Sequence, residues 1–174
     1  GDPVAPDGTI FQRSWWEHGK ARYAYDQPQY EVYARYLSFD TAFKDTDASD
    51  YTGYTVLELT TDFRILIREV RQAKVESADL PSYVKMIALT WNTDGLLREI
   101  VLEDKGSGIT TVQAIKNSID IAWIPPMIRT YKPNTSKTQR ARWITPFCKA
   151  GLILFPQPHA YADWLGDFFD ELFQ

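Results

Sequence analysis

Residues 36–40 form the stretch YLSFD and residues 99–104 form the stretch EIVLED, and each is a strand-like apolar run that ends in acids. The acids are Asp40 in the first stretch and Glu103 and Asp104 in the second. If the two strands are neighbours in one sheet, their backbones lie about 4.8 Å apart and the carboxylates share one pocket. Carboxylates that close repel each other, and a bound cation relieves the repulsion. The pair therefore predicts a Mg²⁺ or Mn²⁺ site at the end of a sheet.

The composition indicates a globular domain. A chain of 174 residues is long enough for one domain with a buried core. Hydrophobic residues make up 44% of the sequence, which excludes disorder, and no apolar run is long enough to cross a membrane. We therefore expect a soluble domain with no membrane partner. Because Cys148 is the one cysteine, an internal disulfide and a multi-cysteine zinc site are excluded, and we expect this thiol to be buried.

Charge is segregated along the chain. The formal net charge is -4, yet residues 121–162 contain no Asp or Glu. The same segment carries a set of basic residues: Arg129, Lys132, Lys137, Arg140, Arg142 and Lys149. A basic wall beside an acidic metal pocket is the pattern expected of a protein that holds a phosphate backbone, so we predict phosphodiester chemistry. The alternative is a solvated basic face on a loop and helix.

Periodicity and turn residues predict a mixed α/β layer architecture. Strands are expected at residues 32–40, 54–60 and 64–71, and the last two form a hairpin through the TTDF turn. A helix with Asp79 as its N-cap follows, then a strand at 98–103 and a short helix that opens at the GSG of residues 106–108. A strand at 127–131, a helix at 136–149, the apolar segment GLILF and a last apolar-striped helix complete the order. Crossover helices on a hairpin-extended sheet are typical of α/β domains.

This order, with acids on the first and fourth strands, resembles the ribonuclease H-like fold. Four motifs resemble those of the nuclease domain of tailed-phage terminase large subunits: YLSFDTAFKDTDASDYTGYTVLEL at 36–59, IVLEDKGSG at 100–108, KTQRARWITPFCKAGLILFP at 137–156 and DWLGDFFDELF at 163–173. The resemblance extends over about residues 7–174. It implies a single ribonuclease H-like domain at residues 31–174, a mixed β-sheet flanked by α-helices, with residues 1–30 as an aromatic-rich cover segment. Those aromatic residues could instead form a docking surface.

The resemblance also implies a function and a ligand set. It implies a metal-dependent endonuclease that hydrolyses concatemeric double-stranded DNA during viral packaging, by a mechanism with two Mg²⁺ or Mn²⁺ ions. Asp40 matches the central metal ligand and Glu103 the second ligand. Asp104 is the reserve for Glu103, because neighbouring strand residues face opposite sides and the sequence does not show which side faces the pocket. Asp50 matches a further acid that the family keeps near the metal.

The basic segment and the partners follow from the same resemblance. Lys137 and Arg140 match the basic pair of the family, and the expected DNA-binding residues are Lys137, Arg140, Arg142, Lys132 and Arg129. The implied partners are double-stranded DNA, the packaging ATPase domain, the small terminase subunit and the portal. The implied location is the host cytoplasm, as part of the packaging machinery and not of the virion.

The chain departs from the family pattern in two places. No GxxxxGK[ST] motif occurs, so the ATPase domain is expected to be absent. The third catalytic acid of the family follows a segment of FP and paired acids, and we expect it to lie beyond Gln174, with Asp163 and Asp167 as weak candidates inside the chain. A fragment without the third ligand is expected to be weakly active or inactive.

Each assignment has a structural alternative. Asp40 could end its strand in an Asx turn, and Asp104 or Ser107 could cap the helix that follows. Lys137 and Arg140 could belong to an exposed helix face. For the whole chain, two other readings are a different ribonuclease H-like DNA nuclease, such as a junction resolvase or an integrase-type core, and a non-catalytic protein-docking domain.

Overall fold

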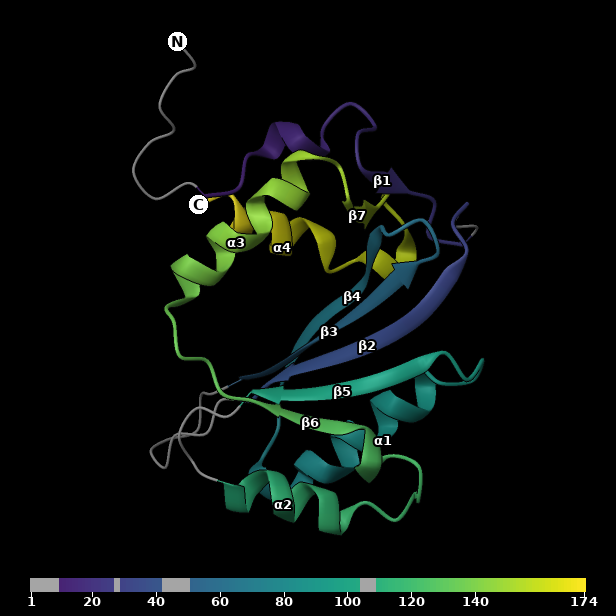
Figure 1. The fold of residues 1–174 in the computed structure, drawn as a ribbon, viewed down its shortest axis with the longest axis vertical. Helices are drawn as coiled ribbons and strands as arrows, with labels where there is room; N and C mark the ends of the chain where they lie inside the picture. Colours follow the sequence, from purple (N-terminus) through teal and green to yellow (C-terminus); the bar gives the residue numbers. More distant parts are fainter. Residues whose placement is uncertain (1–9, 27–28, 42–50, 104–108) are drawn as a thin grey trace.

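A seven-stranded sheet forms the centre of the molecule (Figure 1). The structure, a computed structural model, describes residues 10–26, 29–41, 51–103 and 109–174. The strand order across the sheet is β1-β7-β4-β3-β2-β5-β6. The strands are β1 (Arg22–Tyr23), β2 (Val32–Asp40), β3 (Tyr51–Thr60), β4 (Ile65–Lys74), β5 (Leu97–Glu103), β6 (Ile128–Tyr131) and β7 (Ile153–Pro156).

The sheet is mixed and is covered by helices on both faces. Strands β2, β3 and β4 pair antiparallel, whereas β5, β6, β7 and β1 join by parallel pairing. Figure 1 shows α1 and α2 on one face and α3 and α4 on the other. The helices are α1 (Leu80–Thr90), α2 (Ile109–Ser118), α3 (Lys137–Lys149) and α4 (Leu165–Leu172), with short 3-10 helices at Arg13–Trp16, Ser77–Asp79, Pro125–Met127 and Ala160–Ala162. The predicted fold class, a single domain with a helix-flanked mixed sheet, is confirmed. No helix in the described part of the chain is long and apolar enough to cross a membrane.

The larger core lies between the sheet and the pair α1 and α2. Alternate residues of the two central parallel strands enter it, among them Phe39 of β2 and Leu102 of β5, and both are fully buried. Val84 and Ile87 of α1 pack against them. Because successive strand residues point to opposite faces, this core fixes which side chains of β2 and β5 face α3 and α4.

The second core joins the N-terminal segment to the C-terminal elements. Trp16 is buried against Phe155 of β7 and against Phe169 and Phe173 of the α4 region, with ring centroids 5.3 to 6.4 Å apart. Its indole Nε1 donates a hydrogen bond to the carbonyl of Ile153 at 2.9 Å. The early aromatic residues therefore cover this face of the sheet.

Several elements differ from the sequence predictions. The last three residues of GLILF belong to strand β7 (Ile153–Pro156), which is inserted between β1 and β4, and the two-residue strand β1 was not predicted. Strands β3 and β4 are also longer than expected. Asp79 stands at the N-cap position of α1, but its predicted capping hydrogen bond is wrong: the turn Ser77–Asp79 precedes the helix, and the Leu80 amide donates to the Ser77 carbonyl. Cys148 is buried as predicted, and burial raises the pKa of its thiol to about 11.

A buried ion-pair network lies at the end of β2 opposite to Asp40. Glu58 of β3, only 3% exposed, accepts from Arg35 Nε at 2.9 Å and lies 3.0 Å from Arg68 Nε. Arg35 also donates to Asp94 at 2.7 Å. Burial acts to lower the pKa of Arg35, but hydrogen bonds to Asp94 and the charge of Glu58 outweigh it and raise that pKa. The network ties β2, β3, β4 and the turn before β5 together, so it is a structural feature of the sheet.

Candidate metal centre

Asp40 and Glu103 end two neighbouring parallel strands. In the register of β2 and β5, Phe39 stands opposite Leu102, and the two acids each follow by one residue. Phe39 and Leu102 point into the core under α1 and α2, so Asp40 and Glu103 point to the face that α3 and α4 cover. Neighbouring strands lie about 4.8 Å apart, which places the two carboxylates side by side. The two strands are neighbours, as the sequence analysis assumed, and the role of the two acids as metal ligands stays a prediction.

Asp40 opens onto a pocket between the sheet and α4. The pocket has a volume of about 440 Å³, and its floor is formed by β2, β3 and β4 through Ser38, Thr55, Val70 and Gln72. Gly53 stands opposite Asp40 in the β2 and β3 register. A Cβ atom at Gly53 would meet the backbone oxygen of Arg71 at 3.7 Å, an ordinary van der Waals distance, so a side chain can be added at this position without a clash at its Cβ atom.

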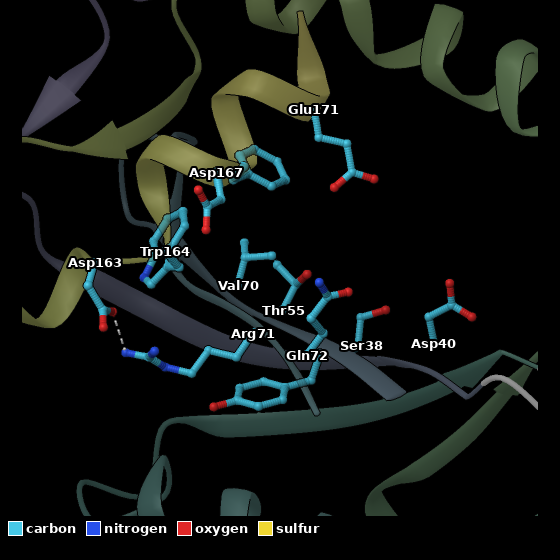
Figure 2. Close-up of a pocket in the computed structure, with 13 residues that line it drawn as sticks. Ser38, Asp40, Thr55, Val70, Arg71, Gln72, Asp163, Trp164, Asp167 and Glu171 are labelled. Atoms are coloured by element: carbon cyan, nitrogen blue, oxygen red, sulfur yellow. Dashed lines mark ion pairs between the residues drawn. The ribbon is translucent and has the colours of Figure 1, made fainter. Parts of the chain in front are cut away.

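The wall of the pocket is acidic. Asp163, Asp167 and Glu171 line it, and their spacing of four residues places them on one side of the α4 segment. Arg71 holds Asp163 in an ion pair at 3.0 Å, at the end of the pocket away from Asp40 (Figure 2). The carboxylate of Glu171 is turned toward the side on which Asp40 lies (Figure 2).

Glu103 is contacted by the basic helix α3. Arg140 Nη2 lies 3.8 Å from Glu103 Oε1, and both side chains are largely buried. Arg140 also donates to the Thr135 carbonyl, which holds the guanidinium close to the start of α3. The hydroxyl of Ser136 caps this helix by accepting from the Gln139 amide at 3.1 Å. A cation of the protein is thus fixed beside one of the two acids.

The pair of acids has the chemistry that a divalent cation requires. Carboxylate oxygens are the ligands that Mg²⁺ and Mn²⁺ prefer, and Asp40 and Glu103 supply them from rigid strand ends. Among the described residues, however, no group of three His, Cys, Asp or Glu side chains stands close enough to hold a metal ion. The two acids therefore supply only part of a metal site, and a divalent ion bound there would need a third ligand.

The remaining predicted site residues fall into three groups. Asp50 and Asp104 lie outside the described residues. Asp163 and Asp167, the candidates for a third acid inside the chain, line the same pocket as Asp40. The predicted DNA-binding residues lie in β6, just after it and in α3: Arg129, Lys132, Lys137 and Arg142 are exposed, and Arg140 is half-buried.

Glu171 was not among the predicted site residues, although it lines the pocket beside Asp167. The sequence does contain a signal for its position on the polar side of the last helix. Asp163, Asp167 and Glu171 recur every fourth residue opposite the apolar stripe of that helix. The pairing of Arg71 with Asp163 has no comparable signal, because the two residues are far apart in sequence.

The sheet order and the helices on both faces of the sheet define a ribonuclease H-like fold. The structure is similar to "Human cytomegalovirus terminase nuclease domain", with a TM-score of 0.59 and 16% identity over 94% of this chain and 86% of that chain. The same viral domain, Mn soaked and inhibitor bound, gives a TM-score of 0.52 and 15% identity over 87% of this chain and 81% of that one.

A bacteriophage protein shows the same likeness. The large terminase from a thermophilic bacteriophage, in complex with ADP, gives a TM-score of 0.58 and 10% identity, over 94% of this chain and 35% of the phage protein. At these identities the likeness concerns the fold, and at that level it confirms the predicted resemblance to terminase nuclease domains. The sequence itself matches no family model and no curated protein.

Proposed function

We propose that this chain is the metal-dependent endonuclease domain of a viral DNA-packaging terminase, which hydrolyses phosphodiester bonds of double-stranded DNA. The observation that carries the proposal is the placement of Asp40 and Glu103 on one face, at the ends of neighbouring parallel strands. The fold that it shares with terminase nuclease domains supports the same assignment. The packaging ATPase domain, the small subunit and the portal are the partners that this function would require.

In the proposed site, Asp40 and Glu103 hold Mg²⁺ or Mn²⁺ through their carboxylate oxygens. A divalent ion bound there would activate water for attack on phosphorus and stabilise the charge of the leaving oxygen. Arg140, fixed 3.8 Å from Glu103, is placed to contact a phosphate next to the metal ligands. The exposed Lys137 and Arg142 on the same helix extend the contact to neighbouring phosphates.

The third ligand has two possible sources. Asp167 and Glu171 on α4 face the pocket that Asp40 lines, and a movement of α4 toward β2 would add one of them to the pair. The other source is sequence that follows Gln174 in a longer protein. If the third ligand lies beyond Gln174, we expect residues 1–174 to be weakly active or inactive, because two carboxylates alone bind the ion weakly.

The test is Mn²⁺-dependent cleavage of supercoiled plasmid by residues 1–174 and by a chain extended beyond Gln174. We expect Asp40→Asn and Glu103→Gln to reduce cleavage to background in whichever form is active. Gly53→Val should also reduce it, because Gly53 stands opposite Asp40 in the strand pair, and a branched side chain there would crowd the Asp40 carboxylate. Asp120→Asn is the matched control, since Asp120 is an exposed acid paired with Lys85.

Several outcomes would contradict the proposal. Undiminished cleavage by Asp40→Asn would show that the metal site is not formed by Asp40 and Glu103. Absence of Mn²⁺-dependent cleavage in both forms would favour the non-catalytic docking domain. A strong preference for four-way junctions over linear duplex would favour a resolvase. Replacing Asp167 with Asn and Glu171 with Gln together in residues 1–174 distinguishes the two sources of the third ligand, because activity falls only if α4 supplies it.

A further inference from the structure

Helix α3 carries a stripe of exposed apolar side chains. Trp143 is 54% exposed, Ile144 44% and Phe147 52%, and their spacing of three and four residues places them on one side of the helix. The side of α3 that packs on the protein is a different one, formed by Cys148 with the half-buried Ala141 and Thr145. Two large aromatic rings are therefore presented outward from a rigid helix.

The stripe is continuous with the candidate metal centre. Arg140 lies three residues before Trp143 and four before Ile144, so it occupies the same side of the helix one turn earlier. Its guanidinium lies 3.8 Å from Glu103. In Figure 1, α3 starts near the ends of β5 and β6 and runs away from them. A ligand that contacts the stripe and extends along it toward Arg140 would arrive at Glu103.

Basic residues accompany the stripe on helix α3. Lys137 is exposed in the first turn, three residues before Arg140 and on the side of the stripe, and Arg142 and Lys149 are exposed on the other sides of the same helix. Residues 121–162, which include the whole helix, contain no Asp or Glu, although the chain has a net charge of -4. Charge complementarity therefore favours an anionic ligand over an ordinary protein surface for this face.

Exposed aromatic rings among cations are the arrangement that binds unpaired nucleic acid. Each unpaired base offers a face for stacking, and the basic residues hold the phosphates between them. The internal base pairs of a duplex offer no such face, because they are stacked on each other. An aromatic stripe that only had to hold duplex phosphates would gain nothing from Trp143 and Phe147.

We propose that the Trp143, Ile144 and Phe147 stripe is a stacking surface for unpaired bases of the DNA strand that enters the metal centre. The substrate class of this site is then single-stranded DNA or duplex DNA with a locally unpaired strand. The proposal rests on the proposed nuclease function, because only a nuclease would cut the bound strand as its substrate. Binding of the bases to the stripe itself requires no metal.

The test is the affinity for labelled oligonucleotides, measured by fluorescence anisotropy in EDTA. The probes are a single-stranded oligonucleotide of mixed sequence and the blunt duplex of the same sequence. The variant is Trp143→Leu with Phe147→Leu, which keeps the surface apolar and removes both rings. We expect it to weaken single-strand binding by at least about tenfold and to change duplex binding little.

The control is Phe63→Leu. Phe63 is 79% exposed in the turn between β3 and β4, at the end of the sheet away from Asp40, so its loss should leave both affinities unchanged. Thermal unfolding followed by circular dichroism checks that the double variant is folded. Arg142→Ala should weaken both probes to a similar degree, because it removes a phosphate contact and no stacking.

The inference would be overturned if the folded double variant bound single-stranded DNA as tightly as the wild type does. The stripe would then be assigned to a protein partner. Equal loss of duplex and single-strand binding would also overturn the inference. Failure of the nuclease proposal is separable from these outcomes, because stacking is measured without metal and cleavage is measured with Mn²⁺. Plasmid cleavage without single-strand binding would refute the stacking surface alone, and single-strand binding without any cleavage would refute the nuclease alone.

Discussion

At the scale of single residues, strand parity decides which acid joins Asp40. Glu103 and Asp104 both follow the apolar run of β5, and the sequence does not distinguish them because the run is apolar on both faces. The burial of Leu102 beneath α1 and α2 fixes the parity and puts Glu103 on the face of Asp40. The pair itself was predictable, because both acids stand at strand ends. The parity depends on contacts that form only when the sheet assembles.

Glu58 provides a residue-scale test of the buried ion-pair network. Replacing Glu58 with Ala leaves Arg35 and Arg68 buried without their shared carboxylate, and we expect a loss of about 3–5 kcal/mol in the free energy of unfolding. Urea denaturation measures it. Asp120→Ala removes the exposed partner of Lys85 and serves as the control, with little expected change. Equal losses in the two variants would contradict the importance of burial.

Asp94 provides a pH-dependent test of the same network. The hydrogen bond from Arg35 lowers the pKa of the Asp94 carboxyl below 3.8 in the folded protein. The unfolded state therefore binds the proton more readily, so the contribution of Asp94 to stability is present above pH 3.8 and is lost as the pH falls through the lowered pKa. We expect the stability difference between wild type and Asp94→Asn to shrink over that range. A difference that stays constant from neutral to acidic pH would show that the carboxylate charge is unimportant.

At the scale of elements, helix α3 contains a proline in its interior, and a neighbouring hydroxyl group compensates for the hydrogen bond that the proline cannot make. Pro146 stands inside the helix and cannot donate to the carbonyl of Arg142. The Thr145 hydroxyl donates to that carbonyl at 2.8 Å instead. The helix was predicted at residues 136–149 from its spacing, and it runs to Lys149 because the freed carbonyl has this partner. Its exposed stripe was missed, since aromatic residues in a helix are usually assigned to the core.

Ser136 is the element-scale test of α3. Removing its hydroxyl with Ser136→Ala takes away the acceptor of the Gln139 amide, and we expect a loss of about 1 kcal/mol in the free energy of unfolding. Chemical denaturation provides the measurement. Thr138→Ala, an exposed change in the first turn of the same helix, should leave stability unchanged or slightly higher. A neutral Ser136→Ala would mean that the start of α3 is held by tertiary contacts alone.

At the scale of the whole molecule, strands from the N-terminal and C-terminal parts of the chain, β1 and β7, form the edge of the sheet next to β4. Strand β7 pairs with β4 on one side and with β1 on the other, so residues near 22, 66 and 154 meet. Local periodicity could not predict this, because Ile153–Pro156 is a short run that is buried throughout and fits several kinds of element. β1 has only two residues and leaves no pattern. The central strands were predictable because each carries its own alternation and turn signals.

Trp16 is the residue on which this long-range assembly can be tested. Trp16→Ala removes a buried ring packed on β7 and α4, and we expect a loss of about 3–5 kcal/mol in the free energy of unfolding. Trp16→Phe keeps a ring but leaves the Ile153 carbonyl without its donor, for a loss of about 1–3 kcal/mol. Denaturation followed by far-ultraviolet circular dichroism distinguishes the two. If Trp16→Ala costs no more than the same change at the half-buried Trp15, the N-terminal segment contributes little to the fold.

The most direct measurement on the metal centre is the location of Mn²⁺ by anomalous diffraction from crystals soaked in the ion, with Asp40→Asn crystals soaked in parallel. We predict an anomalous peak at bonding distance from carboxylate oxygens of both Asp40 and Glu103, and its loss in Asp40→Asn. A peak held only by the acids of the α4 wall, or one that persists unchanged in Asp40→Asn, would contradict the assignment of the site.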